Sequence, residues 1–259
     1  MGKKQQVISR LFEICRQRGD LTFDNALVKS VCREVGFGNA FDATKVDSLT
    51  ILPDDVRQAD YFIVHLGQGR HRFVKGVGIG YHSFEPIEET ERILWKYRRS
   101  LLNELDTSES NILSVASNQR VLHDFLYDDI VASPKAYNAR RTKLRFGYWI
   151  GSERIEAVNL QMEIDFTFEY QGVVTVMEGK NGFPPNFAVY QLFHPFRYYV
   201  EINRKHDLGI REITGCYILR QRVGENSVLR LYNYTFDDPE QMASIRLLKK
   251  AEYHLVHRG

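Results

Sequence analysis

The first third of the chain contains two segments whose apolar residues recur at helical spacing. Over residues 5–18 an apolar side chain returns every three or four positions, and Gly19 ends the pattern. A short extended piece over 21–23 follows. An Asp-Asn pair then offers a cap for a second helix over 24–35, with Gly36 directly after its end. The pattern therefore predicts two amphipathic helices joined by a short link.

Residues 61–79 alternate between apolar and polar positions as strands do, with a turn at Gln68-Gly69. The glycines between 67 and 80 lie inside this alternating sequence, and no helix follows them directly, so a dinucleotide-binding loop is not predicted. A helix pair followed by a hairpin favours a helix-turn-helix or winged-helix-like region that binds DNA. Many small helical bundles begin in the same way, and that alternative stays open.

The remainder of the chain mixes predicted helices and strands. Acidic residues near the start and basic residues near the end predict a helix over 87–104. Ser108 or Ser110 is positioned to cap a helix over 110–130. Strands are then predicted over 143–150, 158–170, 172–180, 211–222 and 227–235, and helices over 186–200 and 238–250, the last capped by Asp237 or Asp238. Strands interspersed with helices indicate an α/β (α+β) fold built on a mixed sheet that helices flank.

Composition excludes several classes of protein. The 259 residues are 43% hydrophobic and 26% charged, with a formal net charge of +2, which differs from a disordered chain. No apolar run approaches the roughly 18 residues of a membrane span, and the N-terminus lacks a signal-peptide pattern. Cys15, Cys32 and Cys216 are too far apart for a zinc site and odd in number, so free thiols and a cytoplasmic location are expected.

One segment, 131–147, carries five basic residues and no acidic one. Such a cluster with Tyr137 and Phe146 among it is typical of a surface that contacts a phosphate backbone. A solvated loop that leads into a strand explains the same charges equally well. The candidate DNA-binding residues are Lys135, Arg140, Arg141, Lys143 and Arg145.

The candidate chemistry lies in a predicted hairpin. Strand side chains alternate between faces, so Glu163, Asp165, Thr167 and Glu169 share one face of the strand. Gln171-Gly172 supplies a turn, and on the next strand Glu178 and Lys180 point in the same direction. The hairpin therefore places Asp165 on one arm and the pair Glu178 and Lys180 on the other. A cross-strand ion pair on a solvated sheet face is the alternative explanation, and such pairs contribute only about 0.2–1 kcal/mol.

This hairpin resembles the catalytic hairpin of the PD-(D/E)xK nuclease superfamily, the restriction endonuclease-like fold. Asp165 stands at the first acid of the motif, and Glu178-Gly179-Lys180 matches its second half. The predicted elements from 110 onward follow the αβββαβ order of the family over roughly the C-terminal 150 residues. Ile164 stands where the motif's name has proline, and Gly179 replaces the usual apolar middle residue.

The resemblance implies a magnesium site and a set of catalytic residues. Asp165 and Glu178, with Glu163 as a further acid, would hold Mg²⁺, which prefers carboxylate oxygens. Lys180 would orient the attacking water and stabilise the developing negative charge. Gln191, on the helix expected beside the site, would position the phosphate or the water. Asp124, Asp128 and Asp129 on the preceding helix are possible outer acids, although solvated or capping roles explain them as well.

The resulting expectation is a Mg²⁺-dependent, sequence-specific endonuclease of double-stranded DNA, similar to type II restriction enzymes. Residues 1–100 would form the DNA-recognition region and residues 101–259 the nuclease domain. Short palindromic targets favour a homodimer, and no organic cofactor or membrane is expected. Two alternatives are a structure-selective repair nuclease of the same fold and a non-catalytic DNA-binding regulator.

Overall fold

The computed structural model describes residues 1–97, 108–224 and 226–257. Its N-terminal part combines helices with a three-stranded antiparallel sheet in the order β1-β3-β2. The elements of this part are α1 (Lys3–Arg18), β1 (Thr22–Asp24), α2 (Asn25–Val35), α3 (Asp54–Gln58), β2 (Tyr61–Gly67) and β3 (Arg70–Lys75). The two predicted helices are confirmed. Gly19 and Gly36 end them in the left-handed conformation, and the Asp24 carboxylate accepts a hydrogen bond from the Leu27 N–H at 2.9 Å.

The C-terminal part is built on a seven-stranded mixed sheet in the order β5-β12-β11-β10-β8-β7-β6. Its strands are β5 (Arg92–Tyr97), β6 (Lys135–Ile150), β7 (Glu153–Tyr170), β8 (Val173–Asn181), β10 (Glu212–Val223), β11 (Asn226–Phe236) and β12 (Ile245–His257). β10 runs parallel to β8 and β5 runs parallel to β12, whereas the other neighbours are antiparallel. The fold is therefore mixed α+β, as the sequence predicts.

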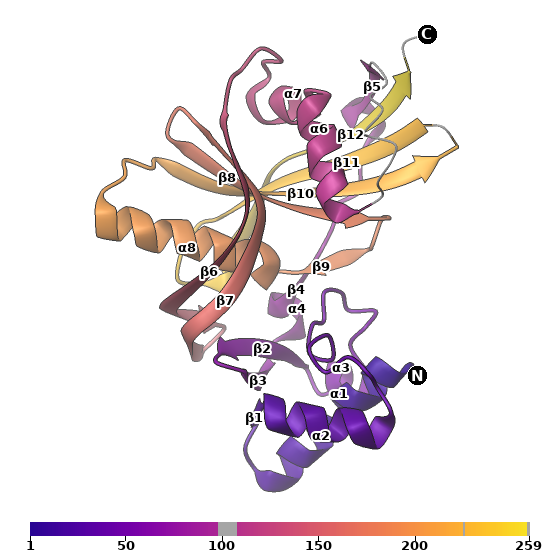
Figure 1. The fold of residues 1–259 in the computed structure, drawn as a ribbon, viewed down its shortest axis with the longest axis vertical. Helices are drawn as coiled ribbons and strands as arrows, with labels where there is room; N and C mark the ends of the chain where they lie inside the picture. Colours follow the sequence, from indigo (N-terminus) through magenta and orange to yellow (C-terminus); the bar gives the residue numbers. More distant parts are fainter. Residues whose placement is uncertain (98–107, 225, 258–259) are drawn as a thin grey trace.

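Helices cover both faces of this sheet (Figure 1). On one face α6 (Glu109–Asn118) and α7 (Val121–Tyr127) bury residues such as Phe125 against Met177 of β8. On the other face α8 (Tyr190–His206) buries Leu192 in the same cluster as Val176 of β8 and Tyr217 of β10. Successive residues of β8 thus face different helices, which is the alternation that a strand imposes. Side chains at even positions of β8, including 178 and 180, lie on the α8 side.

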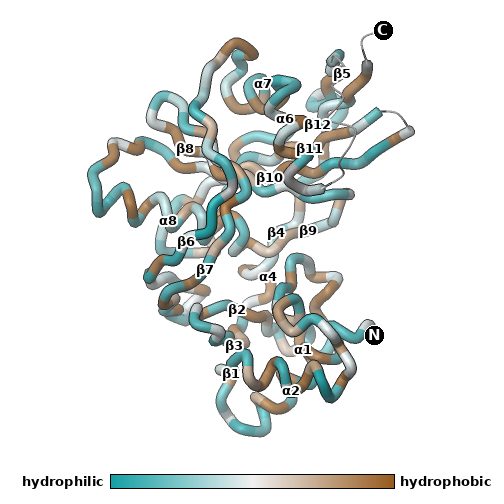
Figure 2. Tube along the Cα trace, viewed as in Figure 1, coloured by the Kyte–Doolittle hydropathy of each residue, from teal (hydrophilic) through white to brown (hydrophobic). Residues whose placement is uncertain are grey.

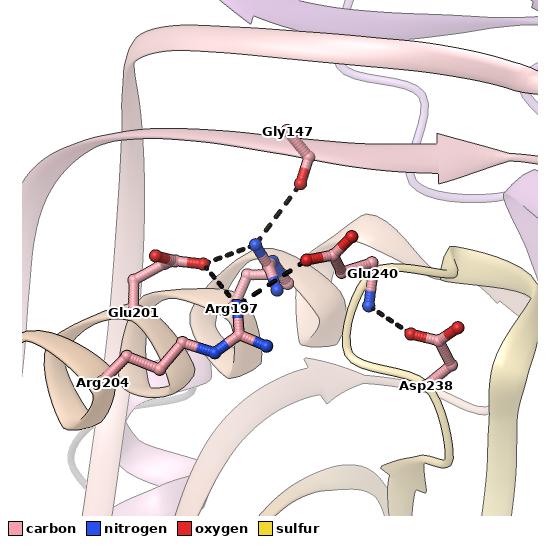
Figure 3. A network of polar contacts seen from close by, with 6 residues as sticks. All are labelled: Gly147, Arg197, Glu201, Arg204, Asp238 and Glu240. Atoms are coloured by element: carbon pink, nitrogen blue, oxygen red, sulfur yellow. Dashed lines mark hydrogen bonds and ion pairs between the residues drawn. The ribbon is translucent and has the colours of Figure 1, made fainter.

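Helix α8 is fixed to its neighbours by a buried arginine (Figure 3). The Arg197 side chain is 2% exposed, and its Nη2 lies 2.6 Å from Glu201 and donates to the Gly147 carbonyl of β6 at 3.3 Å. Arg204 joins Glu201 to Glu240 with contacts of 3.4 Å and 3.7 Å. Burial lowers the pKa of Arg197, which shows that its charge is costly to bury. The nearby Glu201 carboxylate acts in the opposite direction and offsets part of that cost.

The N-terminal and C-terminal parts share one hydrophobic core. Buried residues of α1, α2 and the β2–β3 hairpin belong to the same cluster as those of α8 and β8. Between the two parts, β4 (Tyr81–Ser83) pairs with β9 (Asn186–Ala188), directly before α8, and the short helix α4 (Val77–Gly80) precedes β4. The N-terminal elements are therefore packed close to the start of α8.

The prediction of a helix over 87–104 is wrong. After the short 3-10 helix η1 (Glu89–Glu91), residues 92–97 form β5, the edge strand of the large sheet, although they lie inside the expected N-terminal region. Ile93, Trp95 and Tyr97 alternate with exposed residues and pack against the α6 side. This period of two outweighs the charge gradient that suggested a helix. The end of the expected helix, 98–104, lies outside the described residues.

The prediction of a helix over 238–250 is also wrong. Asp238 does not cap a helix but accepts the Glu240 N–H at 2.8 Å in a turn, followed by the 3-10 helix η2 (Met242–Ser244). From Ile245 the chain forms β12, in which Ala251, Tyr253 and other alternate residues are buried between β11 and β5. The alternation of buried and exposed residues in β12 begins within the predicted helix. Pairing with the distant strands β11 and β5 makes this segment a strand rather than a helix.

Three other boundaries differ from the expectation. The helix over 110–130 is two helices, because Arg120 adopts a positive φ of 63° between α6 and α7, while Ser108 caps α6 by accepting the Asn111 N–H. The strand expected over 143–150 begins at Lys135, so most of the basic segment is edge strand rather than loop. The helix expected from 186 begins at Tyr190, after β9.

Hydrophobic and hydrophilic residues follow one another in short stretches along most of the chain (Figure 2). Among the described residues, no helix combines the length and the apolar character that crossing a membrane requires. All three cysteines are buried and form no disulfide, as expected.

Candidate active site

A cleft of about 910 Å³ opens between the N-terminal part and the large sheet. Its volume is at the upper end of the roughly 300–1,000 Å³ range of ligand pockets. The N-terminal wall comes from the β2–β3 hairpin and from the segment between α2 and α3. The C-terminal wall comes from β7, β8 and the first residues of α8. All the predicted catalytic and metal-ligating residues line this cleft: Glu163, Asp165, Glu178, Lys180 and Gln191.

The two acids of the motif lie where β7 and β8 separate. The antiparallel ladder between these strands ends at the pair Phe166 and Met177. In the same register the next opposed residues are Asp165 and Glu178, and directly opposed residues share a face of the sheet. Beyond this point β8 continues alongside β10 only, with Glu178 beside Tyr217. The end of the ladder thus leaves both carboxylates at the wall of the cleft.

Two side chains contact the Glu178 carboxylate, and a third holds one of them. The Lys180 Nζ lies 3.0 Å from Glu178 Oε1, and the Gln191 Nε2 donates to the same oxygen at 3.1 Å. The Tyr217 hydroxyl in turn donates to Gln191 Oε1 at 3.0 Å, which fixes the orientation of the amide. The Glu178 and Lys180 side chains are 14% and 21% exposed, so both are reachable from the cleft but largely shielded from water.

Gln191 reaches Glu178 because α8 begins there. It is the second residue of this 17-residue helix, whose N-terminal end carries a partial positive charge and favours nearby anions. The preceding residue, Tyr190, donates its hydroxyl to Asp47 Oδ1 of the N-terminal part at 2.8 Å. Burial raises the pKa of Tyr190 well above its usual value, so the phenol stays protonated as the donor. The N-terminal part therefore helps to hold the start of α8.

Glu163 lines the same cleft, but its carboxylate lies 2.8 Å from the Arg141 guanidinium and is half exposed. Among the residues that the structure describes, no three His, Cys, Asp or Glu side chains converge as a metal-binding group. Asp165 and Glu178 line the same cleft, and one or two protein carboxylates together with several waters are the ligands that Mg²⁺ takes. The residues present fit such an ion, with Glu163 at the rim.

The basic segment extends along β6, the edge strand of the large sheet. Lys143 is exposed and lines the cleft, and Arg141 pairs with Glu163 beside it. These two residues oppose positions 161 and 163 of β7, so they follow the same strand that carries Asp165. Part of the segment therefore lies directly next to the candidate catalytic residues.

The other three basic residues lie outside the cleft lining. Lys135 is 76% exposed and lies 3.5 Å from Glu169. The Arg140 guanidinium is 5.1 Å from the centre of the Tyr198 ring of α8, and Arg145 is exposed. An exposed ion pair such as Lys135–Glu169 contributes about 0–1 kcal/mol, so Glu169 competes weakly with a ligand for that cation.

The acids on α7 and directly after it, Asp124, Asp128 and Asp129, have structural contacts on the opposite face of the sheet. Asp124 accepts the Tyr253 hydroxyl at 2.7 Å, Asp128 pairs with Lys249 at 2.6 Å, and Asp129 accepts a backbone N–H two residues further on. None of the three acids lines the cleft. Their alternative explanation, as solvated or capping residues, is the one that these contacts support.

Several residues that line the cleft are not predicted from the sequence. His65, His71 and His194 line it, and burial lowers the pKa of each, to about 4, about 3 and about 3. They are therefore neutral at pH 7. Lys45 and Arg70 bring positive charge from the N-terminal wall. No local motif marks these residues, because only the docking of the N-terminal part brings them to the site.

The fold and the site define a mixed α+β protein with an acid-and-lysine cleft beneath an N-terminal helix-and-hairpin module. A family model described as Domain of unknown function (DUF6997) matches residues 77–254, and the chain belongs to that family. A second model, described as Domain of unknown function (DUF6996), matches residues 5–73. No curated protein and no solved structure matches the chain.

Proposed function

We propose that this protein is a Mg²⁺-dependent endonuclease that cleaves double-stranded DNA at specific sequences, similar to type II restriction enzymes. One observation carries the proposal. Asp165 and Glu178 directly follow the last pair of the β7–β8 ladder, and Lys180 and Gln191 contact Glu178 within one large cleft. Two carboxylates, an amine and an amide grouped in this way suit metal-assisted phosphodiester hydrolysis.

The order of the elements supports the same proposal. The helices α6 and α7, the strands β6, β7 and β8, helix α8 and strand β10 follow one another as αβββαβ. β6, β7 and β8 are antiparallel neighbours, and β10 joins them parallel to β8 after the crossover through α8. This agrees with the resemblance of the sequence to the PD-(D/E)xK superfamily, which therefore gains support from chain topology as well as from the motif.

In this mechanism, Mg²⁺ bound by Asp165 and Glu178 would supply positive charge to a phosphate oxygen and to a bound water. The Lys180 ammonium, at 3.0 Å from Glu178, is positioned to hold the attacking water and to stabilise negative charge on the phosphate. Gln191 orients the Glu178 carboxylate through its amide N–H groups, and the Tyr217 hydroxyl fixes that amide. The low exposure of the pair strengthens each of these electrostatic contacts.

The N-terminal part would hold the DNA. Its helix pair, followed by a hairpin whose second strand also pairs with β1, agrees with a winged-helix-like module. Lys143 and the exposed cations along β6 would neutralise backbone phosphates next to the cleft. A homodimer would match the two-fold symmetry of a short palindromic target, and three free thiols suit the reducing cytoplasm.

The test is incubation of the purified protein with unmethylated phage DNA, with and without Mg²⁺. The proposal predicts a fixed ladder of fragments that requires Mg²⁺ and disappears in Lys180→Ala, while DNA binding survives. Lys249→Ala, on the opposite face of the sheet, is the matched control and should cut normally. Selective nicking of branched substrates would instead indicate a repair nuclease. Sequence-specific binding without cutting by the unaltered protein would indicate a regulator.

A further inference from the structure

The turn between β2 and β3 places three successive residues in the left-handed backbone region. Gly67, Gln68 and Gly69 all have positive φ, at 85°, 54° and 73°. Glycine adopts this left-handed region readily, but Gln68 has a side chain, and such a residue costs about 1–3 kcal/mol when its surroundings hold it there. The β7–β8 turn has a similar pattern, with φ of 50° at Gln171 and 79° at Gly172, because two-residue hairpin turns of this type need positive φ at both central positions. What distinguishes the β2–β3 turn is a third positive φ, at Gly67.

The two glycines are clamped by the rest of the protein. A Cβ on Gly67 would lie 2.1 Å from the Val158 carbonyl oxygen of β7, and one on Gly69 would lie 2.6 Å from Asn25 Nδ2. The Asn25 N–H also donates to the Gly69 carbonyl at 2.8 Å. Only glycine fits at both positions, so the turn has one rigid placement between β7 and the start of α2.

A pair of histidines holds the base of the turn. His65 Nδ1 and His71 Nδ1 are 2.9 Å apart, and His71 Nε2 is 2.9 Å from Asn25 Oδ1. Because the Asn25 oxygen can only accept, His71 carries its proton on Nε2, and His65 donates from Nδ1. Both rings are neutral at pH 7, as their lowered pKa values require. The network therefore ties β2, β3 and α2 together without adding a charge to the cleft wall.

Two side chains of this turn lie in the cleft and are not used by the fold. Gln68 and Arg70 are exposed, and both line the same cleft as Asp165 and Glu178. Within the described part of the chain, neither side chain forms a hydrogen bond or an ion pair. Arg72 of the same strand, by contrast, pairs with Glu153 at 3.0 Å. The rigid turn thus presents an amide and a guanidinium toward whatever occupies the cleft.

We propose that the β2–β3 turn is the base-reading element of this protein, with Gln68 and Arg70 as the residues that contact base edges of the DNA. The inference rests on the nucleic-acid-binding part of the proposed function and assigns its specificity to this turn rather than to α1 or α2. Gln forms paired hydrogen bonds with adenine, and Arg does so with guanine. Side chains that read bases need a fixed backbone, and the clamped turn supplies it.

The test is selection of bound duplexes from a randomised DNA library. Asp165→Asn serves as the background, because it should abolish cutting while leaving the turn intact. Adding Gln68→Ala or Arg70→Ala should reduce discrimination at one base pair by roughly 5–150-fold, as expected for the loss of one paired contact. Adding Lys135→Ala, the matched control on β6, should weaken binding to all sequences alike and reduce the salt slope by about 0.9.

Gln68→Gly separates reading from folding. Removing the side chain at a left-handed position should relieve strain and raise Tm by a few degrees, while the base preference is lost as in Gln68→Ala. An unchanged preference in the Gln68 and Arg70 variants, or no base preference in the background protein, would overturn the inference.

The outcome for the nuclease proposal is measured separately, by Mg²⁺-dependent cutting with the unaltered chain. Cutting together with a base preference that these variants leave unchanged would refute the turn and keep the nuclease. A preference that moves in the variants, without any cutting, would keep the turn and refute the nuclease.

Discussion

Replacement of Lys180 by Met tests the electrostatics of the cleft most informatively. Met keeps most of the length of the apolar stem and removes only the ammonium, which lies 3.0 Å from Glu178 Oε1. Without the ammonium, the Glu178 carboxylate loses a positive neighbour while the negative charge of Asp165 in the same cleft remains. The substitution therefore changes the charge of the site with little change in packing.

The size of the effect follows from the geometry. At 3.0 Å and an effective dielectric of about 20, the attraction between the two charges is about 5.5 kcal/mol. Most of this is offset by desolvation, and hydrogen bonds to charged groups contribute about 1.5–3 kcal/mol net. With about 2–4 °C per kcal/mol for a chain of this size, Tm should fall by roughly 3–12 °C in the absence of divalent ions.

Mg²⁺ should recover part of that loss. In the unaltered protein the ammonium competes with a divalent ion for the Glu178 carboxylate, so Lys180→Met should gain more Tm from Mg²⁺ than the unaltered chain does. DNA cutting should fall by about 10²–10³-fold, because one stabilising donor at the phosphate is lost. Thermal unfolding with and without Mg²⁺, together with a single-turnover cutting assay, measures both effects. Equal Mg²⁺ shifts in the two proteins, or cutting at the normal rate, would show that the Lys180 ammonium has neither role.

Two further predictions concern stability. Glu201→Gln removes the negative charge beside the buried Arg197 and should lower the free energy of unfolding by about 1–3 kcal/mol. The loss is smaller than for a fully buried pair because the Glu201 side chain is 29% exposed. Urea unfolding measures this loss, and an unchanged free energy would show that the pair is dispensable. Burial holds the pKa of His65 at about 4 and of His71 at about 3, below the ordinary value of about 6.5. As the pH falls, the two histidines therefore bind protons in the unfolded chain before they do so in the folded protein. Their contribution to the free energy of unfolding is complete above about pH 6.5 and is lost as the pH falls toward 4. Urea unfolding at about pH 7 and about pH 5 should show the loss, and a His65→Gln, His71→Gln variant should show a smaller one.

The parts of the fold that follow from local sequence are those with local signals. Gly19, Gly36 and the Asp24 cap mark both ends of the N-terminal helices, and the structure has them where these residues predict. The β7–β8 hairpin follows from strict alternation and from a turn at 171–172, where both residues have positive φ. Caps, turns and alternation act over a few residues, so they can be recognised without knowing the rest of the chain.

The parts that could not be predicted depend on distant contacts. β5 and β12 pair in parallel although 160 positions separate their partners, and each has charged positions that imitate a helix. At the site, alternation predicts that Asp165, Glu178 and Lys180 lie together, and all three line one cleft. The N-terminal wall, with His65, His71 and Arg70, comes from docking between two parts of the chain, which leaves no periodic signal in the sequence.

Titration with a divalent ion decides whether Asp165 and Glu178 hold a metal together. Mn²⁺, which also binds carboxylate and water ligands, can be titrated into the protein and followed by its paramagnetic resonance signal. We expect one bound ion per chain in the unaltered protein and in Glu156→Gln, which changes an exposed acid outside the cleft lining. The ion should be lost in Asp165→Asn and in Glu178→Gln. Equal Mn²⁺ binding by all four proteins, or none by the unaltered one, would contradict this expectation.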